Sequence, residues 1–328
     1  MKKKLMYITI LTIFLIPNIF TSCRNPWMED ILSDFFKEPI IPVVKIPKGS
    51  FMMGSPDGSG GINGSTAEPG RISDEVLHLV TLTKGFYMSK YQVTQEQWQT
   101  VMAGNNNNIS ATPSFFTPAN SEPPAGGENQ GKRPVENVSW YDALVFCNKL
   151  SIKDGLTPVY RIKNSTNPAV WGPVPTTNYD SAWDNVTVNW NANGYRLPTE
   201  AEWEYVCRAR TTTAYNTGDA MSDNTGWYFY NSDSDSSGMK THEVGKKPAN
   251  NWGLYDMHGN VNEWCLDWYD DYTSAPQTNP TGVASGSYRV VRGGAYNNDA
   301  QALRSAIRFN GEPWYRFYIL GFRVVRTQ

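Results

Sequence analysis

The residues that could carry out chemistry are few and lie far apart in the sequence. Four cysteines and three histidines occur in 328 residues, which leaves little material for a soft-metal cluster. His78, His242 and His258 are scattered and are interpreted as surface or capping side chains. No nucleophile elbow and no phosphate-binding loop occurs. The corresponding nucleophilic and phosphate-binding chemistries therefore have no support.

One group of acidic residues has the spacing of a catalytic pair. Glu200, Glu202 and Glu204 alternate directly after Thr199, and paired carboxylates can serve as general acid and base. However, Thr199 and Glu202 also form a helix-capping pattern, which places the acids in the first turn of a helix. Carboxylates there stabilise the helix dipole. We interpret the three acids as structural.

Composition excludes several classes of protein. The chain has 29 Lys and Arg against 31 Asp and Glu, a net charge of -2, so it offers no basic face for nucleic acid. Aromatic residues make up 13%, enough ring burial to exclude general disorder. With 27 Gly and 21 Pro, a bundle of long helices is also excluded.

The first residues form a targeting segment. Lys2–Lys4 precede the apolar run Leu5–Phe20, and small residues then lead to Cys23. This order predicts a leader over residues 1–22 that resembles a bacterial lipoprotein signal, with lipidation at Cys23 and a tether to about residue 40. An ordinary secretory leader with an incidental cysteine is the alternative. The other cysteines are odd in number, and we expect buried thiols. They are Cys147, Cys207 and Cys265.

The mature chain predicts one domain of short elements from about residue 41 to 328. Apolar stretches at Ile41–Ile46, Ser50–Met53 and Val76–Thr83 predict strands, and Gly85–Tyr91 is predicted as the hairpin partner of the third. Capping pairs precede three amphipathic runs, which predict short helices. The pairs are Thr94 with Gln97, Ser139 with Asp142, and Thr199 with Glu202.

Five motifs occur in order along the mature chain: Pro134–Trp140, Gly194–Tyr205, Asn251–Trp264, Arg292–Gly294 and Gly321–Arg323. Together they resemble the formylglycine-generating-enzyme family and span nearly the whole mature chain. The resemblance implies an α+β fold of the C-type lectin-like type, with short strands, two main helices and much irregular loop. That expectation agrees with the short elements predicted from the residues themselves.

The resemblance also implies which chemistry to look for. Oxidase members of the family carry a pair of copper-binding cysteines shortly after the Arg-Gly-Gly motif, and cuprous copper needs thiolate ligands. Here the stretch 295–303 contains no cysteine. The iron-dependent sulfoxide synthases of this fold need a histidine cluster, which the scattered histidines do not supply. The sequence therefore predicts no enzymatic activity and no required cofactor.

A structural calcium site is a further implication of the resemblance. Asp256 and Glu263 would supply carboxylates, and Gly259 and Val261 would supply backbone oxygens. Calcium prefers several oxygen ligands, which this turn-rich segment can provide. Asp256 and Glu263 could equally well cap local amides, and both interpretations stay open.

The last segment, about residues 292–323, alternates a frame that contains arginines with an irregular assortment of side chains. It resembles the variable segment of proteins that retroelements diversify, where adenines of template Asn codons are replaced at random. Randomising the adenines of AAC gives Ile, Phe, Gly, Tyr, Ala or Asp, among others, whereas Glu312 and Trp314 do not fit. The aromatic and small polar residues are also typical of a binding surface. The predicted ligand-binding positions are Asn297, Asn298, Asp299, Ala302, Ile307, Phe309, Asn310, Gly311, Tyr315, Phe317, Tyr318 and Ile319, with Tyr296 fitting less securely.

A structural interpretation of the same segment competes with this one. Phe317–Leu320 could be a buried core strand with nothing to bind. Against it, a buried strand should not lie between Arg308, Arg316 and Arg323 without ion-pair partners for them. We therefore favour a displayed surface.

The sequence thus predicts a lipid-anchored, ligand-binding protein of the cell envelope, exposed on the outer membrane, that resembles the variable lipoproteins of host-associated spirochaetes or similar bacteria. Its expected partner is a protein or glycan on another cell or surface. We expect contact with the membrane through the lipid anchor, no nucleic acid, and a monomer. An oxidoreductase of the same family and an inert envelope scaffold are the alternatives.

Overall fold

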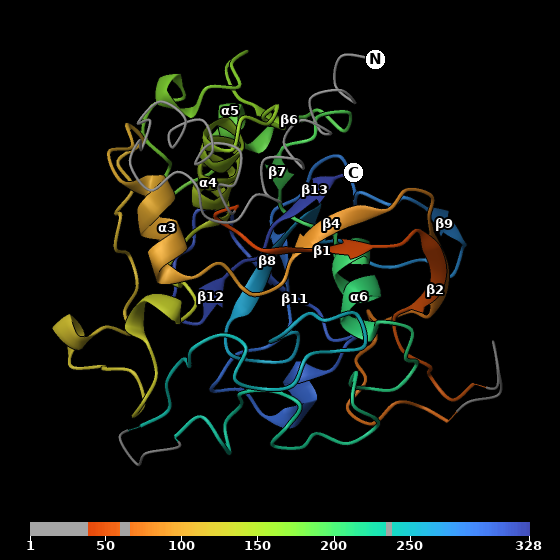
Figure 1. Cartoon of the computed structure of the whole chain (residues 1–328). Helices are drawn as coiled ribbons and strands as arrows, with labels where there is room; N and C mark the ends of the chain where they lie inside the picture. Colours follow the sequence, from red (N-terminus) through yellow and green to blue (C-terminus); the bar gives the residue numbers. More distant parts are fainter. Residues whose placement is uncertain (1–38, 60–65, 234–237) are drawn as a thin grey trace, which may run out of the picture. The chain divides into compact units, whose positions relative to one another are not determined.

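The computed structural model describes residues 39–59, 66–233 and 238–328 (Figure 1). The predicted leader and the predicted lipidation site, Cys23, lie outside the described residues. Ile40–Gln328 form one unit. Within the described ranges, no helix combines the length and the apolar character needed to cross a membrane.

The regular elements are short, and irregular loops connect them. The strands are β1 (Val43–Ile46), β2 (Gly49–Met53), β3 (His78–Leu82), β4 (Phe86–Ser89), β5 (Tyr160–Arg161), β6 (Thr187–Val188), β7 (Tyr195–Arg196), β8 (Asn262–Trp268), β9 (Gln277–Thr278), β10 (Arg289–Arg292), β11 (Phe309–Gly311), β12 (Leu320–Gly321) and β13 (Val325–Thr327). The α-helices are α3 (Gln95–Met102), α4 (Trp140–Lys153), α5 (Ser181–Asp184) and α6 (Glu200–Arg208), and the 3-10 helices are η1 (Pro118–Asn120), η2 (Gln130–Lys132), η3 (Pro168–Val170) and η4 (Ala300–Leu303).

Two sheets organise the domain. The order β1-β4-β13-β7 places the first and the last described strands in one sheet. The order β11-β10-β8-β12 surrounds β8 with strands from the C-terminal part of the chain, and β12 pairs with β8 in parallel. The C-terminal segment is therefore built into the sheet on both sides of β8. The predicted α+β class, with short strands and much loop, is confirmed.

The predicted hairpin of the third and fourth strands is wrong. β4 pairs antiparallel with β1, whereas β3 pairs with β2 and β9. A Cβ atom on Gly85 would lie 2.8 Å from the main-chain oxygen of Ile46, so the missing side chain lets the chain approach β1 at this point. Phe86 and Met88 are then buried in the same hydrophobic cluster as Ile46. Val80 and Leu82 of β3 belong to the same cluster, so neither a shared core nor proximity in the sequence was sufficient to predict the pairing.

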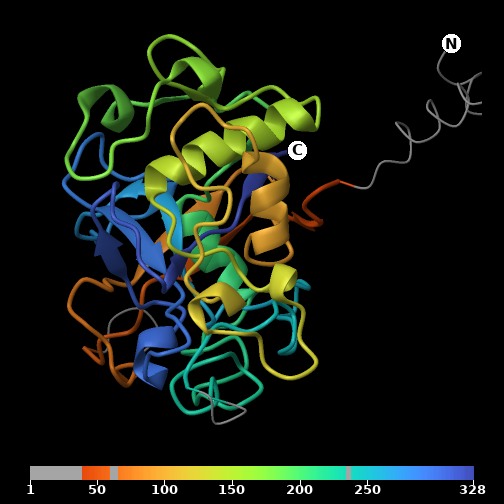
Figure 2. The same ribbon diagram turned by 90° about the vertical axis from the view of Figure 1, so that its left-hand side faces the viewer.

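The three predicted helices form, and each begins at its predicted cap. The hydroxyls of Thr94, Ser139 and Thr199 accept a hydrogen bond from the N–H of the third helical residue, and the reverse bonds close all three capping boxes. α3 and α4 lie side by side (Figure 2), and the Trp98 ring stacks on Phe146 with ring centroids 5.4 Å apart. Local capping and tertiary packing therefore agree.

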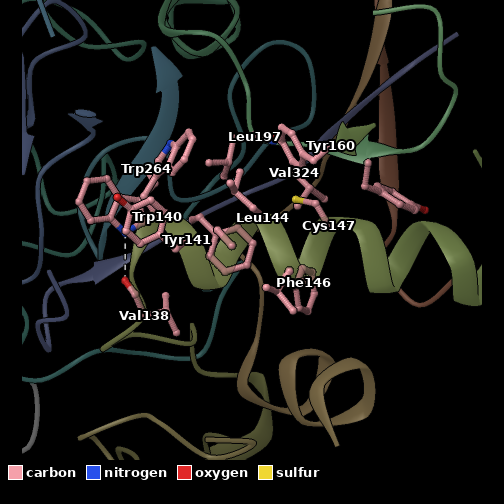
Figure 3. Packing of buried hydrophobic residues seen from close by; sticks show 14 of the residues in the cluster. Val138, Trp140, Tyr141, Leu144, Phe146, Cys147, Tyr160, Leu197, Trp264 and Val324 are labelled. Carbon is pink, nitrogen blue, oxygen red and sulfur yellow. Dashed lines mark hydrogen bonds between the residues drawn. The ribbon is translucent and has the colours of Figure 1, made fainter. Parts of the chain in front are cut away.

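The main hydrophobic core surrounds α4 (Figure 3). Trp140, Leu144 and Cys147 of this helix are completely buried. Trp264 of β8 packs against the same core, and its Nε1–H donates to the main-chain oxygen of Val138 at 3.0 Å. This bond fixes the central strand of the second sheet to the start of α4.

Candidate binding site

Five arginines of the C-terminal segment form ion pairs with carboxylates from other parts of the chain. We call Arg292, Arg304, Arg308, Arg316 and Arg323 the arginine frame. The expectation that Arg308, Arg316 and Arg323 would lack ion-pair partners if the segment were buried is therefore wrong. Charges can be buried here because each is compensated at close range. The pairs are Arg292 with Glu204, Arg304 with Glu68 and Glu75, Arg308 with Glu200, Arg316 with Asp142, and Arg323 with Glu263.

The acids at the start of α6 belong to this network. Glu200 accepts hydrogen bonds from Nε and Nη2 of Arg308 at 2.7 and 2.9 Å. Glu204 binds Arg292 and also Nε of Arg208, at 2.8 Å. Burial acts to raise the pKa of Glu200, but Arg308 and Arg292 outweigh burial and the pKa is lowered. Glu200 and Glu204 are ion-pair partners, which agrees with a structural role, but Glu204 lies beyond the first turn of α6, where it was expected.

The predicted ligand-binding positions differ widely in exposure. Tyr296 and Ile307 are 3% and 6% exposed, so they offer a ligand almost no surface. A Cβ atom on Gly311 would lie 2.9 Å from the buried ring of Trp264, so a larger residue there would have to displace the ring or the backbone. The exposed positions are Asp299, Asn310 and Tyr315, and the half-buried ones, besides Gly311, are Asn297, Asn298, Ala302, Phe309, Phe317, Tyr318 and Ile319.

Aromatic rings around the C-terminal segment join into one strip. Tyr315 stacks on Phe317 with centroids 5.7 Å apart, and Phe317 contacts Tyr318 at 4.1 Å. Phe115, from the loop between α3 and α4, lies 5.5 Å from Tyr318 and is 41% exposed. We call Tyr315, Phe317, Tyr318 and Phe115 the aromatic strip. Sequence reasoning missed Phe115, because only the fold brings it to the C-terminal segment.

A buried carboxylate positions Phe115. Glu136 is 0% exposed and accepts hydrogen bonds from the main-chain N–H groups of Phe115 and Phe116, both at 3.1 Å. Burial raises the pKa of Glu136 to about 7, although both amide donors act to lower it. The Phe116 ring packs edge-on against Tyr296 at 5.0 Å. The strip is thereby connected to the first of the predicted positions.

A second pair of exposed rings flanks these first positions. The main-chain N–H of Phe229 donates to the main-chain oxygen of Asn298 at 3.0 Å. Phe229 and Tyr230 are 44% and 73% exposed, and their rings lie 5.1 Å apart. Sequence reasoning missed them too. The signal available was the aromatic run Trp227–Tyr230 within a polar, glycine-containing stretch.

Three of the four groups predicted to bind calcium converge on a side chain of the protein itself, and the main-chain oxygen of Asp256, not its predicted carboxylate, joins them. The main-chain oxygens of Asp256, Gly259 and Val261 lie 3.3, 3.2 and 2.9 Å from Nε2 of Gln92, and Oε1 of Glu263 lies at 2.9 Å. The carboxylate of Asp256 accepts a main-chain amide hydrogen elsewhere, at 2.7 Å. Because a hydrogen-bond donor fills the point where a cation would lie, these residues do not fit a calcium ion in this arrangement.

The cysteines do not provide a reactive thiolate. Cys147, Cys207 and Cys265 are free and buried, as predicted, and burial raises the pKa of each thiol, that of Cys207 to about 12. Sγ of Cys207 lies 3.7 Å from Nε2 of His258, whose Nδ1 faces the main-chain oxygen of Leu303 at 2.6 Å. Burial lowers the pKa of His258 to about 4, so the pair is neutral. In the described part of the chain, no cluster of three or more His, Cys, Asp or Glu side chains is suited to a metal ion.

Comparison with known protein families identifies the family of this chain. The profile of the sulfatase-modifying factor enzyme 1-like domain matches residues 33–328. The chain belongs to this family. The resemblance to formylglycine-generating enzymes that the motifs carry is thereby confirmed.

Three relatives show the range of proteins that share this domain. The chain is 36% identical to the chaperone protein LppX of Paenibacillus barcinonensis over 232 residues, which are 66% of this chain and 71% of LppX. It matches Treponema denticola variable protein 1 with a TM-score of 0.71 and 36% identity, covering 87% of this chain and 95% of that one. It is 32% identical to the formylglycine-generating enzyme of Streptomyces coelicolor over 156 residues, which are 43% of this chain and 50% of the enzyme.

Proposed function

We propose that this chain is a lipid-anchored protein, displayed on the outer membrane, that binds a ligand through its C-terminal segment. The exposed and half-buried positions of that segment form the contact surface, and retroelement-directed substitution changes them. The ligand is a protein or a glycan on another cell or surface. The similarity to Treponema denticola variable protein 1, over 87% of this chain, supports the proposal.

The observation that carries the proposal is that the arginine frame and the aromatic strip have different roles. The frame holds the backbone, and the strip offers side chains to a ligand. Arg316 forms two hydrogen bonds to Asp142, at 2.6 and 2.7 Å, while its neighbours Tyr315 and Phe317 stack on each other. A backbone held by ion pairs is pre-organised, which lowers the entropy cost of binding. Tyr and Phe supply a large contact area with few rotatable bonds. Exposed side chains between the arginines, such as Tyr315, can therefore be exchanged, and the bound ligand changed, while the fold is retained.

Two observations support a role without catalysis. The stretch 295–303, where the oxidases of the family carry copper-binding cysteines, contains no cysteine. The three described cysteines are buried thiols whose pKa is raised by burial, so they are poor ligands for a metal and poor nucleophiles. We infer that the domain uses the family fold as a scaffold.

The experiment is to sequence this gene and its flanking DNA in independent isolates. The proposal predicts substitutions concentrated at the exposed and half-buried positions other than Gly311, where a side chain would collide with Trp264, with the arginine frame constant. It also predicts a near-copy of the terminal coding stretch, with Asn codons at these positions, beside a reverse transcriptase gene. Substitutions spread evenly over the domain, together with the lack of such a copy, would refute diversification.

An oxidoreductase is the second candidate, because formylglycine-generating enzymes belong to the same family. The assay is oxygen consumption with a cysteine-containing peptide and added copper, with an active family oxidase as the positive control. Our proposal predicts no turnover above the background of free copper. Many turnovers of the peptide thiol per protein molecule, above the free-copper background, would establish the enzyme and contradict our proposal.

The similarity to the chaperone protein LppX favours a third candidate, a scaffold that acts on other envelope proteins. Cross-linking and capture from membranes of several isolates separates the two. A scaffold would retain the same native partner regardless of the residues at Asn310 and Tyr315. A diversified binding protein would capture partners that change with these residues.

A further inference from the structure

Four oxygen atoms, three from the turn before β8 and one from β8 itself, surround one nitrogen atom of Gln92. Nε2 of Gln92 lies 2.9–3.3 Å from the main-chain oxygens of Asp256, Gly259 and Val261 and from Oε1 of Glu263. Gln92 is 1% exposed. A side-chain amide has two N–H groups, so it cannot give each of these acceptors its own hydrogen bond. We call the four oxygens the oxygen cage.

The backbone of the turn makes the cage. Asp256, Gly259 and Asn260 all have positive φ, at 54°, 88° and 64°, which is the left-handed region. A Cβ atom on Gly259 would lie 2.0 Å from the main-chain oxygen of Trp227, so this position requires glycine. The main-chain oxygens of Asp256, Gly259 and Val261 all point to the same nitrogen atom. Their mutual repulsion needs a positive partner at the centre.

The arginine frame supplies the positive charge. Nη2 of Arg323 donates to the main-chain oxygen of Asp256 at 3.2 Å and to Oε1 of Glu263 at 2.8 Å, and Nε donates to Oε2 of Glu263 at 2.6 Å. Nε1 of Trp203 donates to the same Oε2 at 2.7 Å. The carboxylate of Glu263 is therefore already neutralised and saturated. A divalent cation in the cage would meet Arg323 on a shared oxygen and would have to displace Gln92.

The cage supports the C-terminal segment directly. The N–H of Gly259 donates to the main-chain oxygen of Gly293 at 2.9 Å, and the N–H of Tyr296 donates to that of Asn260 at 2.9 Å. The N–H of the first residue of β8 donates to the main-chain oxygen of Ile319 at 2.8 Å. Both ends of the candidate binding segment are thus hydrogen-bonded to the turn that the cage closes.

We propose that Gln92 and Arg323 take the place of a structural cation in this domain. Their donors cross-link the turn, so the fold, and the support that the turn gives to the C-terminal segment, are independent of divalent metal. Gln92 is the residue that excludes the cation. With a carboxylate in its place, the cage would offer five or more oxygens, a donor set of the kind that calcium prefers. The proposal does not depend on which ligand, if any, the C-terminal segment binds.

The test compares the thermal unfolding of the protein in excess EDTA and in millimolar calcium. For the wild type we expect Tm values that agree within about 1 °C, because a ligand that does not bind the native state does not stabilise it. For Gln92→Glu we expect a Tm several degrees lower in EDTA, since a second carboxylate then faces the cage, and recovery of most of that loss in calcium. Gln99→Glu, on the exposed face of α3, is the matched control and should show no calcium response.

Terbium luminescence gives a second, independent measurement. The indole of Trp203 contacts Glu263, so a lanthanide in the cage would be excited by energy transfer from this ring. We expect sensitised emission from Gln92→Glu and none from the wild type. A wild-type Tm that rises several degrees in calcium, or saturable wild-type emission, would overturn the proposal, whether or not the variant folds. A folded Gln92→Glu that responds to neither ion would show that Gln92 is not what excludes the cation.

Discussion

Arg316 and Phe317 are neighbours in the sequence, but their side chains contribute differently to the stability of the fold. Arg316 forms a bidentate pair with Asp142 of α4, whereas the half-buried ring of Phe317 stacks on the exposed Tyr315. The alternation does not extend to Ser305, Ala306 and Ile307, which are buried between Arg304 and Arg308. The arginine frame is fixed to α4, α6, β8 and the loop before β3, and the aromatic strip is free of such bonds. The difference shows how one segment can be rigid in its backbone and exchangeable in its side chains.

Buried ion pairs suit this purpose better than an apolar core would. If apolar side chains anchored this segment, every substitution next to them would disturb the packing of the core, because protein interiors are close-packed. A bidentate guanidinium–carboxylate pair fixes direction as well as distance. Replacing such a pair by well-packed apolar residues can be neutral for stability, but removing one partner is costly. The comparison between frame and strip therefore predicts very unequal effects of single substitutions.

The largest effect is expected for Arg292→Ala. Arg292 is completely buried, binds Glu204, and donates to the main-chain oxygens of Ser305 and Ala306, both at 2.9 Å. Its loss leaves these acceptors without a donor, and we expect a decrease of about 3–5 kcal/mol in the free energy of unfolding. Urea denaturation measures it, with Arg161→Ala, an exposed arginine of β5, as the control. A loss below about 1 kcal/mol would mean that the frame does not hold the segment.

A pH-dependent effect of nearly the same size is expected from Glu136, which holds the Phe115 end of the strip. Its pKa is raised by burial from 4.5 to about 7. A raised carboxyl pKa means that the folded state binds the proton more tightly. The stabilisation is therefore complete below the unfolded pKa and is lost as the pH rises through about 7, by about 3 kcal/mol in total.

The measurement is the free energy of unfolding as a function of pH for the wild type and for Glu136→Gln, which cannot ionise. The difference between the two proteins should change between pH 4.5 and about 7.5 in the stated direction. Groups common to both proteins cancel in this difference. Parallel curves would show that Glu136 titrates normally and that the loop is held in another way.

Gly311→Val tests the boundary between the scaffold and the exchangeable positions, because Gly311 fits the codon pattern but lies against the core. The added side chain would collide with the ring of Trp264, and we expect a destabilisation of about 1–3 kcal/mol. The adjacent Asn310→Val, at an exposed position, is the control and should change stability by less than about 0.5 kcal/mol. Equal, small effects would place Gly311 among the freely exchangeable positions.

Those features of the fold that depend on local chemistry could be predicted from the sequence. The capping boxes at Thr94, Ser139 and Thr199 placed three helix starts correctly, because a cap is decided within one turn. The pairing of β4 could not be predicted, since β1 and β3 both contribute to the core that contains Phe86 and Met88 and only the folded chain shows which of them is the partner. Register and pairing between distant segments are tertiary properties.

The candidate site shows the same limit. The codon pattern identified positions but not their exposure, so it placed the buried Tyr296 and Ile307 beside the exposed Asp299 and Asn310. The contribution of Phe115 depends on a contact with Tyr318 that no local pattern encodes. The partners of the arginine frame were also invisible, because their carboxylates lie on α4, α6, β8 and a loop far away in the sequence. Long-range pairs of this kind are seen only in the folded chain.

The smallest effect is expected for Tyr315→Ala, and it tests the other side of the comparison. Tyr315 is 43% exposed, and its ring contacts Phe317 within the strip. Exposed positions without special contacts tolerate substitution, so we expect a change of about 0.5 kcal/mol or less in the free energy of unfolding. Phe317→Ala should cost more, about 1–2 kcal/mol, because this half-buried ring also packs against the main core. The two variants bracket the boundary between the contact surface and the scaffold. A loss for Tyr315→Ala as large as that for Phe317→Ala would assign the whole strip to the core, and the division on which the binding proposal depends would not exist.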